Sequence, residues 1–167
     1  SESDARVMAM ELELAELFEK IAGKIDARLA AKWLRRELLR VLNYNKKTLR
    51  DVEFGEKELV ELLSLVRTGK ISETTAQRIM EKLVEKKFSP KEYVKRMGLA
   101  RLTSDTKITE LCKKVIKKEV RAVKDYLCGR EESFHYLIGR VMSLSKGRAD
   151  PTLTNKIIKE ELKTKMK

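Results

Sequence analysis

The side chains that could carry out catalysis are few and poorly placed for it. Two pairs of adjacent glutamates, Glu131–Glu132 and Glu160–Glu161, fall on expected helices, where neighbours one residue apart point in different directions and cannot share a proton. The single histidine, His135, stands in no spacing that suggests a catalytic triad. Gly69–Lys70 lacks the earlier glycine of a phosphate loop, because Ser64 lies five positions before Gly69. We therefore expect no catalytic residue in this sequence.

The two cysteines do not indicate a metal site. Cys112 and Cys128 are 16 residues apart, a spacing that matches no zinc signature, and only one histidine is available to help them. We expect two free, reduced thiols, no bound metal and no cofactor held by this part of the chain.

The surface that could bind a ligand is basic and lies between residues 140 and 167. The turn Ser145–Asp150 leads into a helix start, where free amides and the positive end of the helix dipole favour an anion. Because the Asp150 side chain competes for those amides, we expect a phosphate to meet side chains instead. The candidate contacts are Lys146, Arg148, Arg140, Lys156 and Lys159. The alternative is a charged, solvated turn with no ligand.

The net charge favours a polyanionic partner. The chain has 38 basic and 26 acidic residues, a formal charge of +12. Residues 98–167 carry 17 basic and 9 acidic side chains, whereas residues 1–97 carry 21 and 17. A folded surface of this kind, with few aromatic residues, suits RNA duplexes, which are bound mainly through phosphates and 2′-hydroxyls.

The elements that must position these side chains are helices. Leu, Lys, Glu, Arg, Ala and Val dominate the composition, and apolar residues recur at steps of three and four. We predict an all-α fold of two small domains, residues 1–100 and 101–167, with the boundary in Gly98–Asp105. The first helix should bury Val7, Met10, Leu14, Leu17 and Ile21. Residues 43–55 read as a loop.

The second domain reads as three helical units. The first either continues past Lys118 or bends there, and Gly139 inside the second unit suggests close helix packing. No apolar stretch approaches the ~20 residues needed to cross a bilayer, and no signal peptide is visible. The chain begins abruptly inside a helical pattern, so we expect a piece of a longer cytoplasmic protein.

Several segments resemble one family in the same order along the chain. The run LIGRVMSLSKGRADP (residues 137–151) resembles LVGQVMKATKGKANP at the end of the GatB/YqeY domain. AKWLRRELLRVLN, LVRTGKISETTAQRIMEKL and SPKEYVKRMGLARLTSD resemble helices of the middle domain of the B subunit of the aspartyl/glutamyl-tRNA amidotransferase. The opening SESDARVM favours the B subunit over the tail of the archaeal E subunit, which is the near alternative.

The resemblance implies a middle helical bundle followed by a three-helix YqeY-like tail. It also implies partners: tRNA, and the A and C subunits of the amidotransferase. The family's catalytic cradle, which uses ATP and magnesium to activate the misacylated Glu-tRNA(Gln) or Asp-tRNA(Asn), is absent from this chain. What remains resembles the part of a ligase that holds tRNA, with Lys146 and Arg148 at the matching positions. The competing hypotheses are a module that docks on a synthetase or on the amidase subunit, and an independent enzyme.

Overall fold

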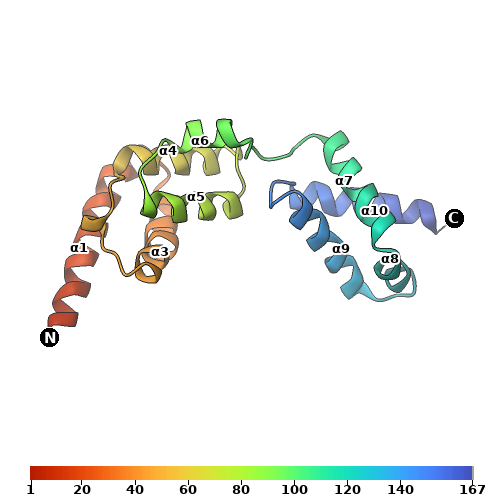
Figure 1. Ribbon diagram of the computed structural model, residues 1–167, viewed down its shortest axis with the longest axis horizontal. Coiled ribbons are helices and arrows are strands. Elements are labelled where there is room, and N and C mark those ends of the chain that lie inside the picture. The colour runs from red at the N-terminus through yellow and green to blue at the C-terminus, as the bar shows by residue number, and fades with distance from the viewer. Residues whose placement is uncertain (167) are drawn as a thin grey trace. The chain divides into compact units, whose positions relative to one another are not determined.

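The computed structural model describes residues 1–166, and these residues form helices and no strand (Figure 1). The predicted all-α fold is thereby confirmed. The chain divides into two compact units, Ser1–Leu99 and Ala100–Lys167. Each unit has its own hydrophobic core.

Unit 1 is a bundle of short helices. It contains α1 (Glu2–Ala22), α2 (Ala27–Lys32), the π-helix η1 (Trp33–Leu38), α3 (Leu39–Tyr44), the 3-10 turn η2 (Leu49–Asp51), α4 (Glu56–Arg67), α5 (Glu73–Glu85) and α6 (Pro90–Met97). The stretch 43–55 is therefore a loop that holds one short turn, and α3 extends into its first two residues.

Side-chain caps start several of these helices. The Asp26 carboxylate accepts the amide of Leu29 at 2.9 Å, which begins α2. The Ser89 hydroxyl accepts the amide of Glu92 at 3.3 Å and donates to Glu61 of α4 at 2.7 Å. The start of α6 is thus tied to α4 as well as to its own first turn.

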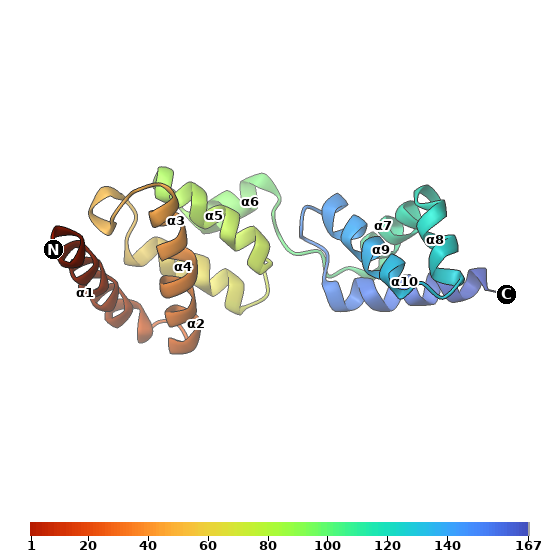
Figure 2. The ribbon, with the colours of Figure 1, turned by 90° about the horizontal axis from the view of Figure 1, so that it is seen from below.

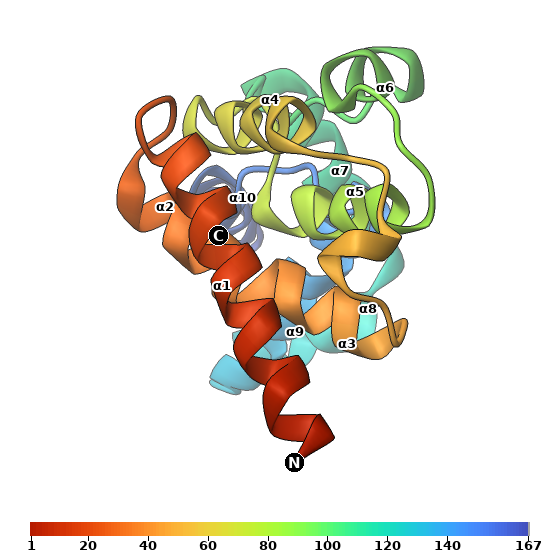
Figure 3. The ribbon, with the colours of Figure 1, turned by 90° about the vertical axis from the view of Figure 1, so that its left-hand side faces the viewer.

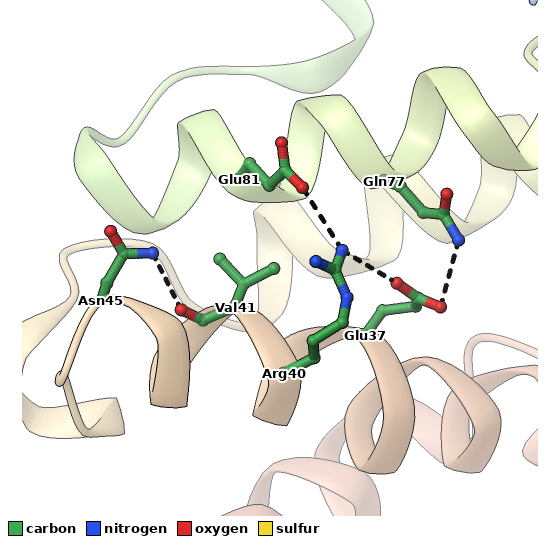
Figure 4. A network of polar contacts seen from close by, with 6 residues as sticks. All are labelled: Glu37, Arg40, Val41, Asn45, Gln77 and Glu81. Atoms are coloured by element: carbon green, nitrogen blue, oxygen red, sulfur yellow. Dashed lines mark hydrogen bonds and ion pairs between the residues drawn. The ribbon is translucent and has the colours of Figure 1, made fainter.

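The helical run from α2 through η1 to α3 packs against α5. Trp33 is buried in the core of unit 1. Arg40 Nη2 donates to Glu37 and to Glu81 of α5, both at 3.3 Å, and Gln77 Nε2 donates to Glu37 at 3.2 Å (Figure 4). Arg40 therefore links α3 to α5 through its contact with Glu81.

The N-terminal half of α1 extends past the other helices of unit 1 (Figures 1 and 3). Of the five residues expected to be buried on α1, only Leu14 and Ile21 are, and Val7 is 59% exposed. Met8 and Leu12 are also exposed. The periodicity correctly predicted the helix, but the helix is longer than the core that it packs on.

Unit 2 contains α7 (Asp105–Lys118), α8 (Val120–Leu127), α9 (Glu131–Leu144) and α10 (Pro151–Lys165). The first of the three helical segments expected in the tail is divided into α7 and α8, because Glu119 adopts φ −96° and ψ 52° and interrupts the helix. The described part of the tail therefore has four helices, where three were expected. α10 runs beside α7 and α9 (Figure 2).

Gly139 does not mark a close helix contact, contrary to expectation. It lies exposed in α9, and a Cβ placed there would meet no atom within 4 Å. The packing of α9 is instead made by Phe134, Leu137 and Val141, which are buried on the opposite side. The glycine is therefore not required by any neighbouring helix.

Candidate nucleic-acid interface

The turn between α9 and α10 is built on two residues in the left-handed region. Lys146 has φ 54° and Gly147 has φ 74°. Their amides close the end of α9, with Lys146 donating to Ser143 O at 3.0 Å and Gly147 donating to Met142 O at 2.8 Å. This arrangement satisfies carbonyls that the end of a helix otherwise leaves unpaired. The Lys146 side chain is exposed at the tip of the turn.

The remaining amides of the turn are used inside the protein. Arg148 N donates to Ser145 O at 3.1 Å, Ala149 N to Ser145 Oγ at 3.1 Å, and Asp150 N to Leu102 O at 3.2 Å. Leu102 N in turn donates to Arg148 O at 2.7 Å, so the segment before α7 anchors the turn. An anion at this place would have to meet side chains, because the amides are already occupied.

Arg101 is a residue of this site that the sequence reasoning missed. Its Nη2 atom lies 2.7 Å from Asp150 Oδ2, and both side chains are about three-quarters buried. The Asp150 carboxylate also accepts the amide of Leu153 at 2.9 Å and so caps α10. The one carboxylate of the turn is therefore neutralised locally, which lowers its repulsion of a phosphate. No short-range sequence signal links residues 49 positions apart.

Arg140, the third candidate, is bound to Glu119 at the break between α7 and α8. Its Nε atom donates to Glu119 Oε1 at 3.0 Å, and the Tyr136 hydroxyl donates to the other oxygen of the same carboxylate at 3.2 Å. The three side chains join α9 to the break between α7 and α8. Arg140 thus has a structural partner that the sequence did not suggest.

Lys156 and Lys159 lie on the exposed face of α10, three residues apart and hence on neighbouring turns. Lys159 Nζ stands 5.5 Å from the centre of the Phe134 ring, a cation–π distance. The five candidates therefore form three groups: the turn with Lys146 and Arg148, the α10 pair, and Arg140 at the α7–α8 break.

Comparison with known proteins gives this arrangement its context. A family model described as the GatB domain matches residues 16–162. The chain belongs to the GatB domain family. It is 37% identical over 161 residues to the B subunit of the aspartyl/glutamyl-tRNA(Asn/Gln) amidotransferase of Methanothermobacter thermautotrophicus, covering 96% of this chain and 36% of that protein.

Two further relatives with the same name show the same pattern. The B subunit from Methanobrevibacter smithii is 37% identical over 158 residues, with 95% of this chain and 35% of that protein covered. The B subunit from Bacillus cytotoxicus is 32% identical over 160 residues, with 95% and 34% covered. The chain spans about a third of the length of these relatives, and the resemblance to the C-terminal region of the B subunit is confirmed.

The described residues of this GatB domain contain no group of three histidine, cysteine or acidic side chains that could hold a metal ion. Cys112 is buried against α10, and burial, with a smaller effect from Glu161, raises the pKa of its thiol to about 11. Cys128 is exposed. None of the helices in residues 1–166 is long and apolar enough to span a membrane.

Proposed function

We propose that this chain is the tRNA-binding region of an amidotransferase B subunit and has no active site of its own. It would position misacylated Glu-tRNA(Gln) or Asp-tRNA(Asn) for transamidation by the remainder of the ligase in the cytoplasm, together with the A and C subunits. ATP and magnesium would be used in the catalytic cradle. The names of the relatives support the substrate class.

The observation that carries this proposal is the anchored basic turn between α9 and α10. Lys146 stands exposed on a backbone whose amides are all bonded within the protein, and the carboxylate of Asp150 is paired with Arg101. The surrounding unit has 17 basic and 9 acidic residues and is therefore strongly positive. A rigid, positively charged projection of this kind suits contact with phosphates of a folded RNA.

The α10 pair extends the same chemistry. Lys156 and Lys159 share one exposed helix face, and side chains on successive turns are spaced to meet neighbouring phosphates along a strand. We assign them to supporting contacts, because neither lies on a feature as constrained as the turn. Arg140 is the weakest of the five candidates, since its guanidinium already bonds to Glu119.

The test is a salt titration of unmodified tRNA binding to the full chain and to a Lys146→Glu/Arg148→Glu variant. Each phosphate contact contributes a slope of about 0.9 to the fall of log K with log salt. If the two contacts contribute nothing at about 1 M salt, their loss should weaken binding by about 60-fold at about 0.1 M salt and by about 9-fold at about 0.3 M. Reversal of charge adds repulsion, so these values are lower bounds.

The matched control is Lys113→Glu/Lys117→Glu on α7, which makes the same charge change on exposed lysines of the same unit. A smaller effect of the control supports the turn as the contact. Equal effects of the two variants would show that overall charge, and not this turn, governs binding. Binding that does not respond to salt would refute phosphate contact altogether.

One observation favours a second candidate function, the docking of a protein partner. Met8 and Leu12 are 70% and 63% exposed on α1, which also forms one side of a groove of about 490 Å³ against residues of α2, η1 and α3. The groove is lined mainly by Leu14, Ala15, Phe18, Ala31, Leu34 and Leu39. An apolar groove with exposed apolar neighbours is typical of a helix-binding surface.

This second candidate is tested by a pull-down of amidotransferase subunits and synthetases with a Met8→Glu/Leu12→Glu variant. Loss of a protein partner with unchanged tRNA affinity would assign α1 to protein docking. Retention of every partner would remove that function from this surface.

A further inference from the structure

We propose that unit 1 carries a second RNA-binding site, a groove between α1 and the connection from α3 to η2 that takes one nucleotide of a bound RNA. This inference rests on the proposed function and extends it to the other unit. The groove has a volume of about 550 Å³ and is lined by Arg6, Val7, Ala9, Met10, Glu13, Asn43, Lys46, Lys47, Thr48 and Arg50. Four of these residues are basic and one is acidic.

The carboxylates at the groove are already engaged. Glu13 accepts from Arg50 Nε at 2.6 Å. Asp51, next to the groove, accepts the amide of Thr48 at 2.7 Å and its hydroxyl at 2.9 Å, and these bonds lower the pKa of the Asp51 carboxyl. The charges of Lys47 and Arg6 also contribute to that lowering. Neither carboxylate requires a further cation from the groove.

The four basic side chains of the groove differ in how far they already bond to other groups of the protein. Lys47 Nζ donates to Val84 O at 3.0 Å and is used to join the connection to the end of α5. Arg50 is 82% exposed even with its Nε bound to Glu13, which leaves the outer part of its guanidinium toward solvent. Arg6 and Lys46 are exposed, and neither forms an ion pair with any carboxylate in residues 1–166. Three positive groups are thus available to a ligand.

The α1 side of the groove contributes apolar side chains, and these bear on the kind of ligand that fits. Val7 is 59% exposed and Met10 is partly buried, and both lie on the α1 side. A phosphate alone would not need this surface. A nucleotide fits both features, because its sugar and base can bury the apolar surface of Val7 and Met10 while its phosphate meets Arg6, Lys46 and Arg50.

The backbone conformation of Lys46 is a separate observation that also supports a binding role for its side chain. Lys46 has φ 53°, a left-handed conformation that glycine adopts at lower cost. The side chain is nevertheless a lysine, exposed at the rim of the groove. A glycine here would serve the turn and remove the charge.

The experiment uses that property. In the full chain, Lys46→Gly should leave the melting temperature unchanged or raised and should weaken binding of unmodified tRNA about eightfold at about 0.1 M salt, as expected for one lost phosphate contact. Arg6→Gln/Lys46→Gly should weaken it about 60-fold. The matched control, Arg28→Gln/Lys95→Gln, removes the same charge from exposed positions of unit 1 outside the groove and should have a smaller effect.

A second measurement identifies the ligand. A benzophenone amino acid in place of Asn43, which lines the groove and is exposed, should crosslink to the tRNA. Competition by polyglutamate as effective as that by tRNA would overturn the assignment to RNA. If the variants of Lys146 and Arg148 lose tRNA while those of Arg6 and Lys46 match their control, the groove is refuted and the proposed function stands. If neither set affects binding, both fail.

Discussion

The free energy of the contact between Arg140 and Glu119 can be measured, and it distinguishes a structural role of Arg140 from a contact with RNA. The two side chains are 36% and 20% exposed, and the Nε–Oε1 distance is 3.0 Å. Exposed ion pairs contribute about 0.2–1 kcal/mol, and hydrogen bonds to charged groups contribute about 1.5–3 kcal/mol. Because this pair is partly buried and replacement by glutamine keeps an acceptor, we expect Glu119→Gln to cost about 1 kcal/mol.

The assay is a double-mutant cycle by thermal unfolding of the full chain, with Glu119→Gln, Arg140→Gln and the two combined. A loss of about 1 kcal/mol lowers the melting temperature of a domain of about 60–100 residues by about 4–8 °C. The coupling energy should account for most of the single-variant effect. Glu110→Gln on α7 is the control, since Glu110 is exposed and forms no ion pair with another residue in the described chain.

The tRNA affinity of the same variants provides the refutation. If Arg140 is a structural residue, Arg140→Gln lowers the stability of the chain. Its effect on tRNA affinity should then differ by less than about twofold from the effect of removing one exposed charge elsewhere on the chain. The reasoning fails if the coupling energy is below about 0.2 kcal/mol and Arg140→Gln weakens tRNA binding about eightfold at about 0.1 M salt. Arg140 would then be a phosphate contact after all.

Three further outcomes follow from the structure. Gly139→Ala should raise the free energy of unfolding by about 0.5–1 kcal/mol in urea titrations, because the added methyl meets open space and the helix loses a flexible residue; a loss of stability would show a contact there. Iodoacetamide at about pH 8 should alkylate the exposed Cys128 and spare Cys112, whose thiol pKa is raised to about 11, until the chain is unfolded; equal rates by mass spectrometry would contradict the burial. Burial alone would raise the pKa of Glu58, but a hydrogen bond from the amide at the start of α4 and the charge of Lys87 leave it below its ordinary value. Its stabilising effect is therefore present above the ordinary carboxyl pKa and lost as pH falls through the lowered one, so Glu58→Gln should flatten the acid side of the stability curve.

The features that the sequence predicted well are local. Asp150, which the sequence placed at a helix start, accepts the amide of Leu153 and caps α10, because a cap needs only residues three positions apart. The recurrence of apolar residues at steps of three and four was also enough to predict the all-α fold, although on α1 only Leu14 and Ile21 of the expected face are buried.

The features that the sequence could not predict are contacts between distant positions. Arg101 and Asp150 are 49 residues apart, and Arg140 and Glu119 are 21 apart, so neither pair leaves a periodic or short-range signal. The exposure of the first half of α1 is of the same kind, since a stripe shows which face is apolar but not how far the core extends. The basic groove was missed because its cations come from α1 and from a loop that follows much later in the chain.

The two proposed RNA sites share a backbone feature that bears on why their lysines are there. In the described chain, Lys46 and Lys146 are the non-glycine residues with positive φ, and each follows the end of a helix, α3 or α9. A left-handed conformation costs a non-glycine residue about 1–2 kcal/mol, whereas a cation near a helix C-terminus regains about 0.3–1 kcal/mol. The dipole alone therefore does not offset the cost, although glycine serves the same kind of turn at Gly69 and Gly98. Glycine would serve both turns without this cost, so under the proposed function the lysine charge is what these two positions supply to the RNA.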